Sequence, residues 1–161
     1  MAVASESSRL DGVALEVWRS YLQSHAAIVR ELDAELRVQH GLTARDYEVL
    51  LYLAQADGHR LPMSALSERT GLTRSGITRL IDGLVAAALI ERESCESDAR
   101  ISYARLTEAG YVKLKDAGCT HVAGIERLFL AHFSPVELAQ LASLLARLPG
   151  ATLDGGACTA D

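Results

Sequence analysis

The chain has 161 residues, of which 49% are hydrophobic, and a formal net charge of −5 at pH 7. This length and apolar content predict one globular domain with a core of ordinary size and exclude an intrinsically disordered chain. The acidic balance does not by itself indicate a nucleic-acid partner, and the longest apolar run, residues 84–90, is too short to cross a membrane.

The first predicted element is a long helix over residues 10–40, which Gly41 ends. Its apolar residues fall on two adjoining faces, whereas a surface helix of a globular domain needs only one. One face carries Leu10, Ala14, Val17, Tyr21, Ile28 and Leu32, and the other carries Trp18, Leu22, His25, Val29 and Leu36. We therefore expect one face to pack within its own domain and the other to pack on a second protomer.

A helix-turn-helix pattern follows. A second helix is predicted to begin at Thr43, with Asp46 in the position of a capping box. A short helix over residues 63–70 leads to a turn at Gly71, and Thr73 is the predicted N-cap of the next helix. The apolar stripe of that helix is Ile77, Ile81, Leu84 and Ala88, and the polar residues away from it are Arg74, Ser75, Thr78, Arg79 and Asp82. Arginine and short hydroxyl side chains suit phosphate oxygens and base edges in a major groove.

A β-hairpin is predicted next, with strands over residues 89–93 and 101–106 and a polar tip between them. Residues 60–79 hold four arginines against one glutamate, so this region is basic in an acidic chain. Local charge matters more than total charge, because physiological salt screens exposed charges beyond about 8 Å. The hairpin mixes arginines with acidic residues, so electrostatics alone leaves DNA binding undecided.

Two more helices complete the predicted fold, which is mainly α with a small β-hairpin. Thr107 is the predicted N-cap of the first, and Ser134, Pro135 and Glu137 form a strong start signal for the second. Residues 151–161 are small and glycine-containing and are expected to be a disordered tail.

The hairpin carries a motif that resembles the wing of the MarR (multiple-antibiotic-resistance) family of regulators. The family motif is Asp-x-Arg, five residues and Leu-Thr, and this chain has Asp98 and Arg100 followed at that spacing by Leu106 and Thr107. The helix over residues 73–82 also resembles the family's recognition helix. The family usually has glycine before the first wing strand, where this chain has three alanines. The helix therefore either runs further, or Ala88 occupies a strained turn.

The resemblance implies a single winged helix-turn-helix domain over residues 1–161. Residues 10–40 and 107–148 are the expected dimerisation helices, and residues 43–106 are the expected DNA-binding lobe. The implied function is that of a sequence-specific transcriptional regulator, a ligand-responsive repressor that binds a pseudo-palindromic DNA operator as a homodimer. Such a protein is no enzyme and needs no cofactor or metal.

The DNA-binding residues expected on this basis are Thr73, Arg74, Ser75, Thr78, Arg79, Asp98 and Arg100. A carboxylate beside DNA is explained if Asp98 holds the guanidinium of Arg100 in one pose. The alternative for Asp98 is a solvated hairpin tip.

A ligand pocket is predicted at Trp18, Tyr21, His25 and Tyr47, because similar proteins bind phenolic or other aromatic molecules beneath the DNA-binding lobe. Aromatic side chains offer such ligands stacking surfaces and a few polar groups. The alternative is that these four residues are ordinary interface core, and both interpretations hold if the pocket lies beside the interface.

Other functions find less support in the sequence. There is no Gly-x-Ser-x-Gly turn and no glycine-rich phosphate loop. His121 and His132 share a helix face but lie roughly 16 Å apart, too far for one metal ion. The lack of a signal peptide and three widely spaced cysteines predict a reducing, cytoplasmic setting. Two alternatives stay open: a redox-sensing regulator, although Cys95 lies beside Glu96 in a setting that disfavours a thiolate, and a winged-helix protein-interaction module without DNA binding.

Overall fold

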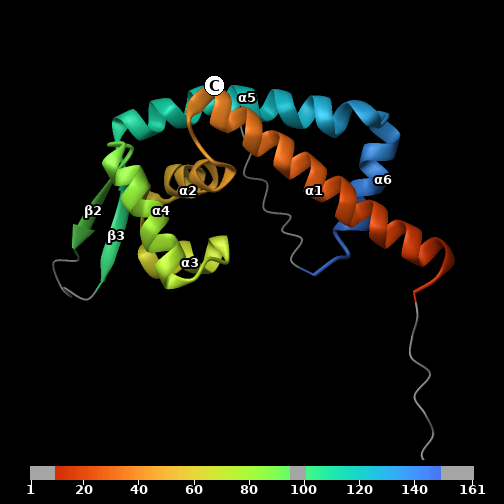
Figure 1. Ribbon diagram of the computed structural model, residues 1–161, viewed down its shortest axis with the longest axis horizontal. Helices are drawn as coiled ribbons and strands as arrows, with labels where there is room; N and C mark the ends of the chain where they lie inside the picture. The colour runs from red at the N-terminus through yellow and green to blue at the C-terminus, as the bar shows by residue number, and fades with distance from the viewer. Residues whose placement is uncertain (1–9, 95–100, 150–161) are drawn as a thin grey trace, which may run out of the picture.

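The computed structural model describes residues 10–94 and 101–149. Its elements are α1 (Gly12–His40), α2 (Ala44–Gln55), β1 (Arg60–Pro62), α3 (Met63–Thr70), α4 (Arg74–Ala86), β2 (Ile90–Ser94), β3 (Ser102–Leu106), α5 (Glu108–Leu128) and α6 (Pro135–Leu145), with single 3₁₀ turns at Asp57–His59 and Leu130–His132. The long helices α1 and α5 run along one side, and α2, α3, α4 and the sheet form a lobe at one end of them (Figure 1). The predicted class, mainly α with a β wing, is confirmed.

Side-chain caps fix where α2, α4 and α6 begin. Thr43 and Asp46 form a complete capping box, with each backbone N–H donating to the other residue's side chain at 2.8 and 3.0 Å. The Thr73 hydroxyl accepts a hydrogen bond from the Gly76 N–H, which starts α4. Ser134 and Glu137 form a second capping box at α6. These starts agree with the predictions because each depends on residues only three positions apart.

The sheet has three strands, in the order β1-β3-β2, and all neighbours are antiparallel. The sequence predicted only the hairpin, so β1 is a correction. This strand has only three residues and ends in Pro62, so its sequence shows no alternating pattern that would predict a strand. Residues 60–62 form a strand because they pair with β3, where Leu61 lies opposite Ala104.

The connection from α4 to β2 is a tight turn with Ala88 in the left-handed region, at φ +58°. Helix α4 ends at Ala86, so the strained turn, and not a longer helix, is the alternative that the structure adopts. The Ala88 N–H donates to the Val85 carbonyl at 2.9 Å, and the Leu89 N–H donates to the Leu84 carbonyl at 3.0 Å. This is the hydrogen-bond pattern of a Schellman motif, which places its left-handed residue where glycine is usual.

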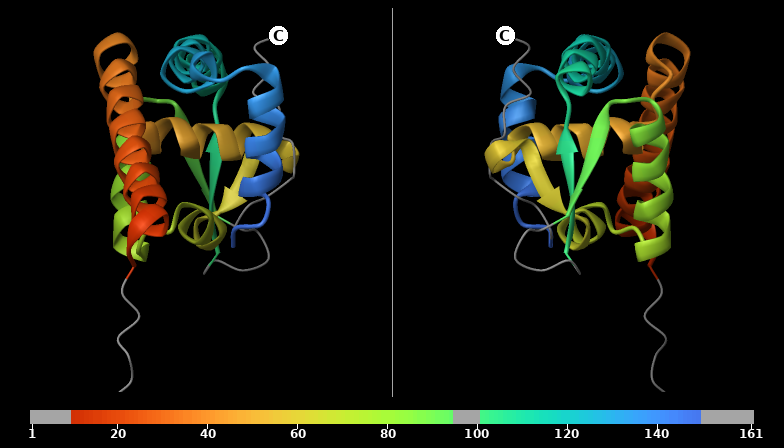
Figure 2. Two further views of the ribbon diagram at one scale, coloured as in Figure 1. Left: turned by 90° about the vertical axis from the view of Figure 1, so that its right-hand side faces the viewer. Right: turned by 90° about the vertical axis from the view of Figure 1, so that its left-hand side faces the viewer.

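The core fills the lobe and does not reach the distal ends of the long helices. In the end-on views, α5 covers the lobe, α2 crosses its middle and α3 closes it from below (Figure 2). Leu50 and Leu53 of α2, Leu66 of α3 and Ile81 of α4 are fully buried. Helix α1 contributes only Leu32 and Leu36 near its end, and α6 contributes no buried residue.

Within the described residues, no single helix is both long enough and apolar enough to cross a membrane. The segments Glu108–His132 and Pro135–Leu145 meet those criteria only as a pair, and the chain bends by 100° between them.

Candidate nucleic-acid interface

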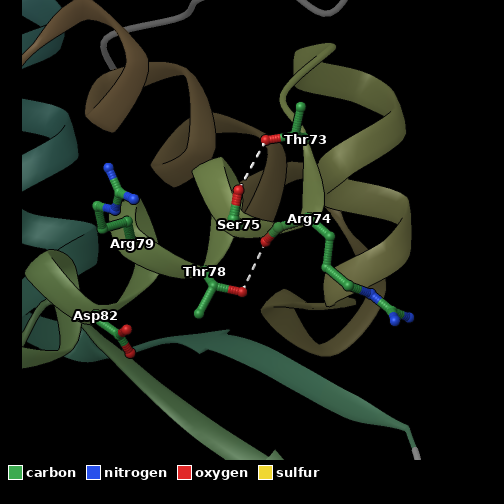
Figure 3. Close-up of a pocket in the computed structure, with 6 residues that line it drawn as sticks. All are labelled: Thr73, Arg74, Ser75, Thr78, Arg79 and Asp82. Carbon is green, nitrogen blue, oxygen red and sulfur yellow. Dashed lines mark hydrogen bonds between the residues drawn. The ribbon is translucent and has the colours of Figure 1, made fainter.

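The exposed side of α4 lines an open hollow, and the residues around it are polar or charged. Ile77, Ile81 and Leu84 turn into the core, which leaves the opposite side of the helix facing outward. The hollow measures about 650 Å³ and is lined by Thr73, Arg74, Ser75, Thr78, Arg79 and Asp82. Figure 3 shows the side chains of Arg74 and Arg79 pointing to opposite sides, with Ser75 and Thr78 between them. The structure thus brings together the five predicted DNA-binding residues of the helix.

The hydroxyl groups of this surface have different tasks. The Thr73 oxygen accepts the capping hydrogen bond and lies 3.2 Å from the Ser75 hydroxyl. The Thr78 hydroxyl donates to the Arg74 carbonyl at 2.8 Å, so its oxygen remains available as an acceptor. Thr73 is therefore foremost a cap, and Ser75 and Thr78 are the hydroxyls presented in the middle of the hollow.

Two of the four arginines in the basic segment already have partners elsewhere. The guanidinium of Arg60 pairs with Glu93 at 3.3 Å and lies 5.1 Å from the centre of the Tyr103 ring. The guanidinium of Arg69 lies 5.6 Å from the centre of the Tyr52 ring. For Arg74 and Arg79, the described part of the chain shows neither an ion pair nor a ring contact. The free positive charge of the segment is therefore concentrated on α4.

On the outer face of the sheet, acidic and basic side chains pair with one another, so their charges cancel. Glu93 accepts hydrogen bonds from Arg105 and Arg60, and these hold the pKa of its carboxyl below the usual range. Arg105 also lies 3.9 Å from Glu91, which stands opposite it in the β2–β3 register. These residues alternate with those that face the core, so they share one side of the sheet.

A further ion pair joins the wing to α4. Arg92 of β2 donates to the carboxylate of Asp82 at 2.7 Å and to the carbonyl of Thr78 at 3.4 Å. Sequence reasoning placed Asp82 on the outer face of the helix but did not pair it. The alternation of side chains along β2 could have indicated this pair, because Arg92 lies on the same face of the strand as Ile90, which is buried in the core.

The wing tip, residues 95–100, lies outside the described residues. The expectations for Asp98, Arg100 and Cys95 therefore remain predictions.

The predicted ligand residues fall into two places. Trp18, Tyr21 and His25 stack along α1, with ring centres 6.1 and 6.2 Å apart, and all three are exposed. Tyr47 is buried in the lobe and packs on His121 of α5, with ring centres 4.6 Å apart. The first half of α1 leads away from α2 (Figure 1). The aromatic ladder thus belongs to an exposed helix face, and Tyr47 belongs to the core.

His121 occupies a desolvated position. Burial lowers the pKa of its imidazole below the ordinary value of 6.5, and its buried Nδ1 atom has no hydrogen-bond partner among the residues that the structure describes. Among the described histidine, cysteine, aspartate and glutamate side chains, no group of three is placed to hold a metal ion.

The arrangement is that of a winged helix-turn-helix DNA-binding protein: α3 and α4 form the helix pair, and β2 and β3 form the wing. The MarR family model matches residues 40–101. The chain belongs to the MarR family of transcriptional regulators, and its relatives are regulators and not enzymes.

Curated relatives support this assignment. The chain is 30% identical over 115 residues to the HTH-type transcriptional regulator PapX of Escherichia coli, a match covering 60% of this chain and 70% of PapX. It is 29% identical over 97 residues to the HTH-type transcriptional repressor YetL of Bacillus subtilis. That match covers 60% of this chain but only 52% of YetL, so the chain spans about half the length of that relative.

Solved structures agree along most of the chain. AbsC, a MarR family transcriptional regulator from Streptomyces coelicolor, superposes with a TM-score of 0.80 at 32% identity, covering 86% of this chain and 93% of AbsC. Sco3205 from the same organism, solved in complex with DNA, gives a TM-score of 0.79 at 28% identity, covering 85% and 89% of the two chains.

Proposed function

We propose that the protein is a homodimeric repressor that binds a pseudo-palindromic operator and is released by a small aromatic or phenolic ligand. The observation that carries the proposal is the exposed face of α4. This face combines two guanidinium groups that form no ion pair with the described residues and two central hydroxyls, opposite a buried apolar stripe. Arg74, Ser75, Thr78 and Arg79 are the proposed major-groove contacts, and Thr73 sets the start of the helix that presents them.

The proposed dimer places two copies of α4 about 34 Å apart, so that they enter successive major grooves on one face of the duplex. Exposed apolar side chains on the terminal helices support this assembly, because a soluble monomer rarely exposes a large contiguous apolar patch. They include Val13, Val17, Leu22, Val29, Val122, Val136, Leu144 and Leu145, and Phe133 is exposed between α5 and α6.

The wing completes the proposed contact with DNA. The ladder of β2 and β3 runs regularly as far as the pair of Ser94 and Ser102. We place Arg100 in the adjacent minor groove, where a narrow groove concentrates negative potential. The role proposed for Asp98 is to orient the guanidinium of Arg100 toward that groove.

The proposed ligand site uses the aromatic ladder of Trp18, Tyr21 and His25 on α1. Tyr47, the fourth residue predicted for this site, lies apart from the ladder in the core of the lobe. The ligand must bind the DNA-free and DNA-bound arrangements with different affinities in order to release the operator. Trp18 is the only tryptophan, so its fluorescence reports on this site. Titration with simple phenols and benzoates should change the fluorescence. Release of DNA by such a compound with unchanged potency in a Trp18→Phe variant would place the site elsewhere.

The decisive test is a mobility shift with the DNA upstream of the protein's own gene, alongside a random duplex of equal length. We expect a discrete complex with the upstream DNA at protein concentrations that leave the random duplex free. We also expect affinity to fall steeply with salt, because binding releases condensed counterions. If neither duplex is bound even at low salt, the fold serves another purpose, such as protein docking.

A further inference from the structure

The proposed DNA-binding face of α4 contains one acidic residue, Asp82, whose charge disfavours contact with DNA. Asp82 lines the same hollow as Arg74, Ser75, Thr78 and Arg79, and its side chain is 62% exposed. A carboxylate at this position repels the phosphates that the two arginines attract. Its presence needs an explanation beyond electrostatic attraction.

Arg92 supplies a partner for this carboxylate from a different element. Its Nη2 atom donates to Oδ1 of Asp82 at 2.7 Å and to the backbone oxygen of Thr78 at 3.4 Å. Thr78 and Asp82 are four residues apart, so one guanidinium spans a full turn of α4. The contact holds both a side chain and the backbone of the helix.

The described strands use their arginines in two ways. Arg60 of β1 and Arg105 of β3 pair with Glu93, which holds the sheet together on its outer face. The side chain of Arg92 of β2 lies on the other face of the sheet, away from Glu93, and reaches α4. The pair of Arg92 and Asp82 therefore joins the wing to the recognition helix and not the strands to one another.

We propose that Arg92 is a positioning residue for DNA recognition: with Asp82 as its anchor, it fixes the wing relative to α4 so that both meet the duplex as one unit. This inference rests on the DNA-binding function proposed above. An exposed ion pair adds little to the stability of a fold. Its effect here is on binding, because elements held in their bound arrangement lose less conformational freedom when DNA arrives.

Charge and positioning predict opposite results for one substitution. Asp82→Asn removes a negative charge from the DNA-facing surface, so attraction alone predicts tighter binding to every duplex. Positioning predicts weaker binding to the correct sequence, because Arg92 loses the carboxylate that anchors it. Binding to random DNA does not need that arrangement and should stay equal or become tighter.

The experiment uses a short duplex that the wild-type protein selects from a random pool, and a scrambled duplex of the same composition. The variants are Asp82→Asn, Arg92→Gln and the double variant. We expect Asp82→Asn to weaken binding to the selected duplex about tenfold, which is within the range of coupling between contacting residues. Binding to the scrambled duplex should not weaken, and the double variant should bind the selected duplex no worse than Arg92→Gln alone.

Two controls separate this role from general damage to the wing. Arg105→Gln removes the ion pairs of Arg105 with Glu91 and Glu93 on the outer face and does not affect α4, so it should preserve the ratio of selected to scrambled affinity. Thermal unfolding midpoints of the Asp82 and Arg92 variants should lie within a few degrees of wild type, since the lost pair is exposed.

Equal tightening of both complexes by Asp82→Asn, or additive losses in the double variant, would overturn the positioning role. In those cases Asp82 acts only through its charge. If the wild-type protein selects no sequence at all, the DNA-binding function fails, and this inference fails with it.

Discussion

At the residue scale, the arginines of α4 and the sheet divide into those that pair with carboxylates and those that the proposed function assigns to DNA. Arg60, Arg92 and Arg105 each pair with a carboxylate of the sheet or of α4. Arg74 and Arg79 point outward from α4 (Figure 3). Counting basic residues along the sequence therefore overstates the charge that a phosphate meets and does not tell which side chains carry it.

Arg79→Ala should weaken binding to the operator by about 1–3 kcal/mol if the guanidinium contacts a base, with a smaller loss on random DNA. The measurement is a titration of each duplex at several salt concentrations. Arg127→Ala is the charge-matched control, because Arg127 pairs with Glu35 at the contact of α1 and α5. Equal losses on both duplexes would instead assign Arg79 to a phosphate.

His121 should make stability depend on pH. Its folded-state pKa lies below 6.5 because of burial, so the unfolded chain binds more protons below that value. Its contribution to stability is complete above pH 6.5 and is lost as the pH falls from there through the folded pKa. Thermal unfolding of wild type and His121→Phe on both sides of this pH measures the effect. We expect a smaller loss in the variant, and identical pH profiles would contradict it.

At the element scale, predictability followed the range of the interactions. The caps at Thr43, Thr73 and Ser134 are contained in a few neighbouring residues, and all three were predictable. Strand β1 exists only because β3 pairs with it, and its sequence carries no strand pattern. The contact of Arg92 with Asp82 also joins separate elements. The sequence therefore predicted which residues lie on the exposed face of α4, but it did not predict the ion pair between that face and β2.

Ala88→Gly should stabilise the protein by about 0.5–1 kcal/mol. The left-handed turn strains alanine by about 1–2 kcal/mol, and the greater freedom of glycine in the unfolded chain offsets only part of the gain. Ala87→Gly is the matched control, because Ala87 has φ −83°, which alanine adopts without strain. That neighbouring change should destabilise. Chemical denaturation of both variants measures the two signs, and a loss of stability in Ala88→Gly would contradict the strain.

Gly110→Ala should destabilise the protein by about 1–3 kcal/mol or more, as expected for overpacking. A β-carbon at Gly110 would lie 2.1 Å from the Leu89 carbonyl oxygen and 2.7 Å from Cδ1 of Leu106, so α5 could not stay against the base of the hairpin. Gly83→Ala is the control, because a β-carbon there meets no atom within 4 Å. It should stabilise α4 by about 0.5–1 kcal/mol. Equal effects of the two changes in denaturation would refute the close contact.

At the scale of the whole molecule, the lobe has a closed hydrophobic core, whereas the distal parts of the terminal helices leave apolar side chains exposed. Leu32 and Leu36 belong to that core although they lie in α1. Removing α1 would therefore damage the lobe as well as the proposed interface. A test of the dimer must change the exposed face and leave these leucines in place.

The double variant Val13→Glu, Val17→Glu should convert the proposed dimer to a folded monomer. These side chains are 74% and 62% exposed, so glutamate there costs the isolated fold little and places charge in the apolar interface. Sedimentation gives the oligomeric state, and circular dichroism confirms folding. Val38→Glu, near the lobe end of α1 and 85% exposed, should leave the dimer intact. A wild-type monomer at micromolar concentration, or an intact dimer in the double variant, would exclude this interface.

The self-neutralised outer face of the sheet also bears on how the protein first meets a duplex. The chain carries a net charge of −5, and among the described residues Arg74 and Arg79 on α4 are the arginines of the basic segment without an ion pair or ring contact. A long polyanion is therefore repelled by most orientations of the molecule and attracted by one. If α4 binds DNA as proposed, encounters in which α4 faces the duplex should last longer than the others. An acidic DNA-binding protein of this kind exchanges some overall attraction for correct orientation on arrival.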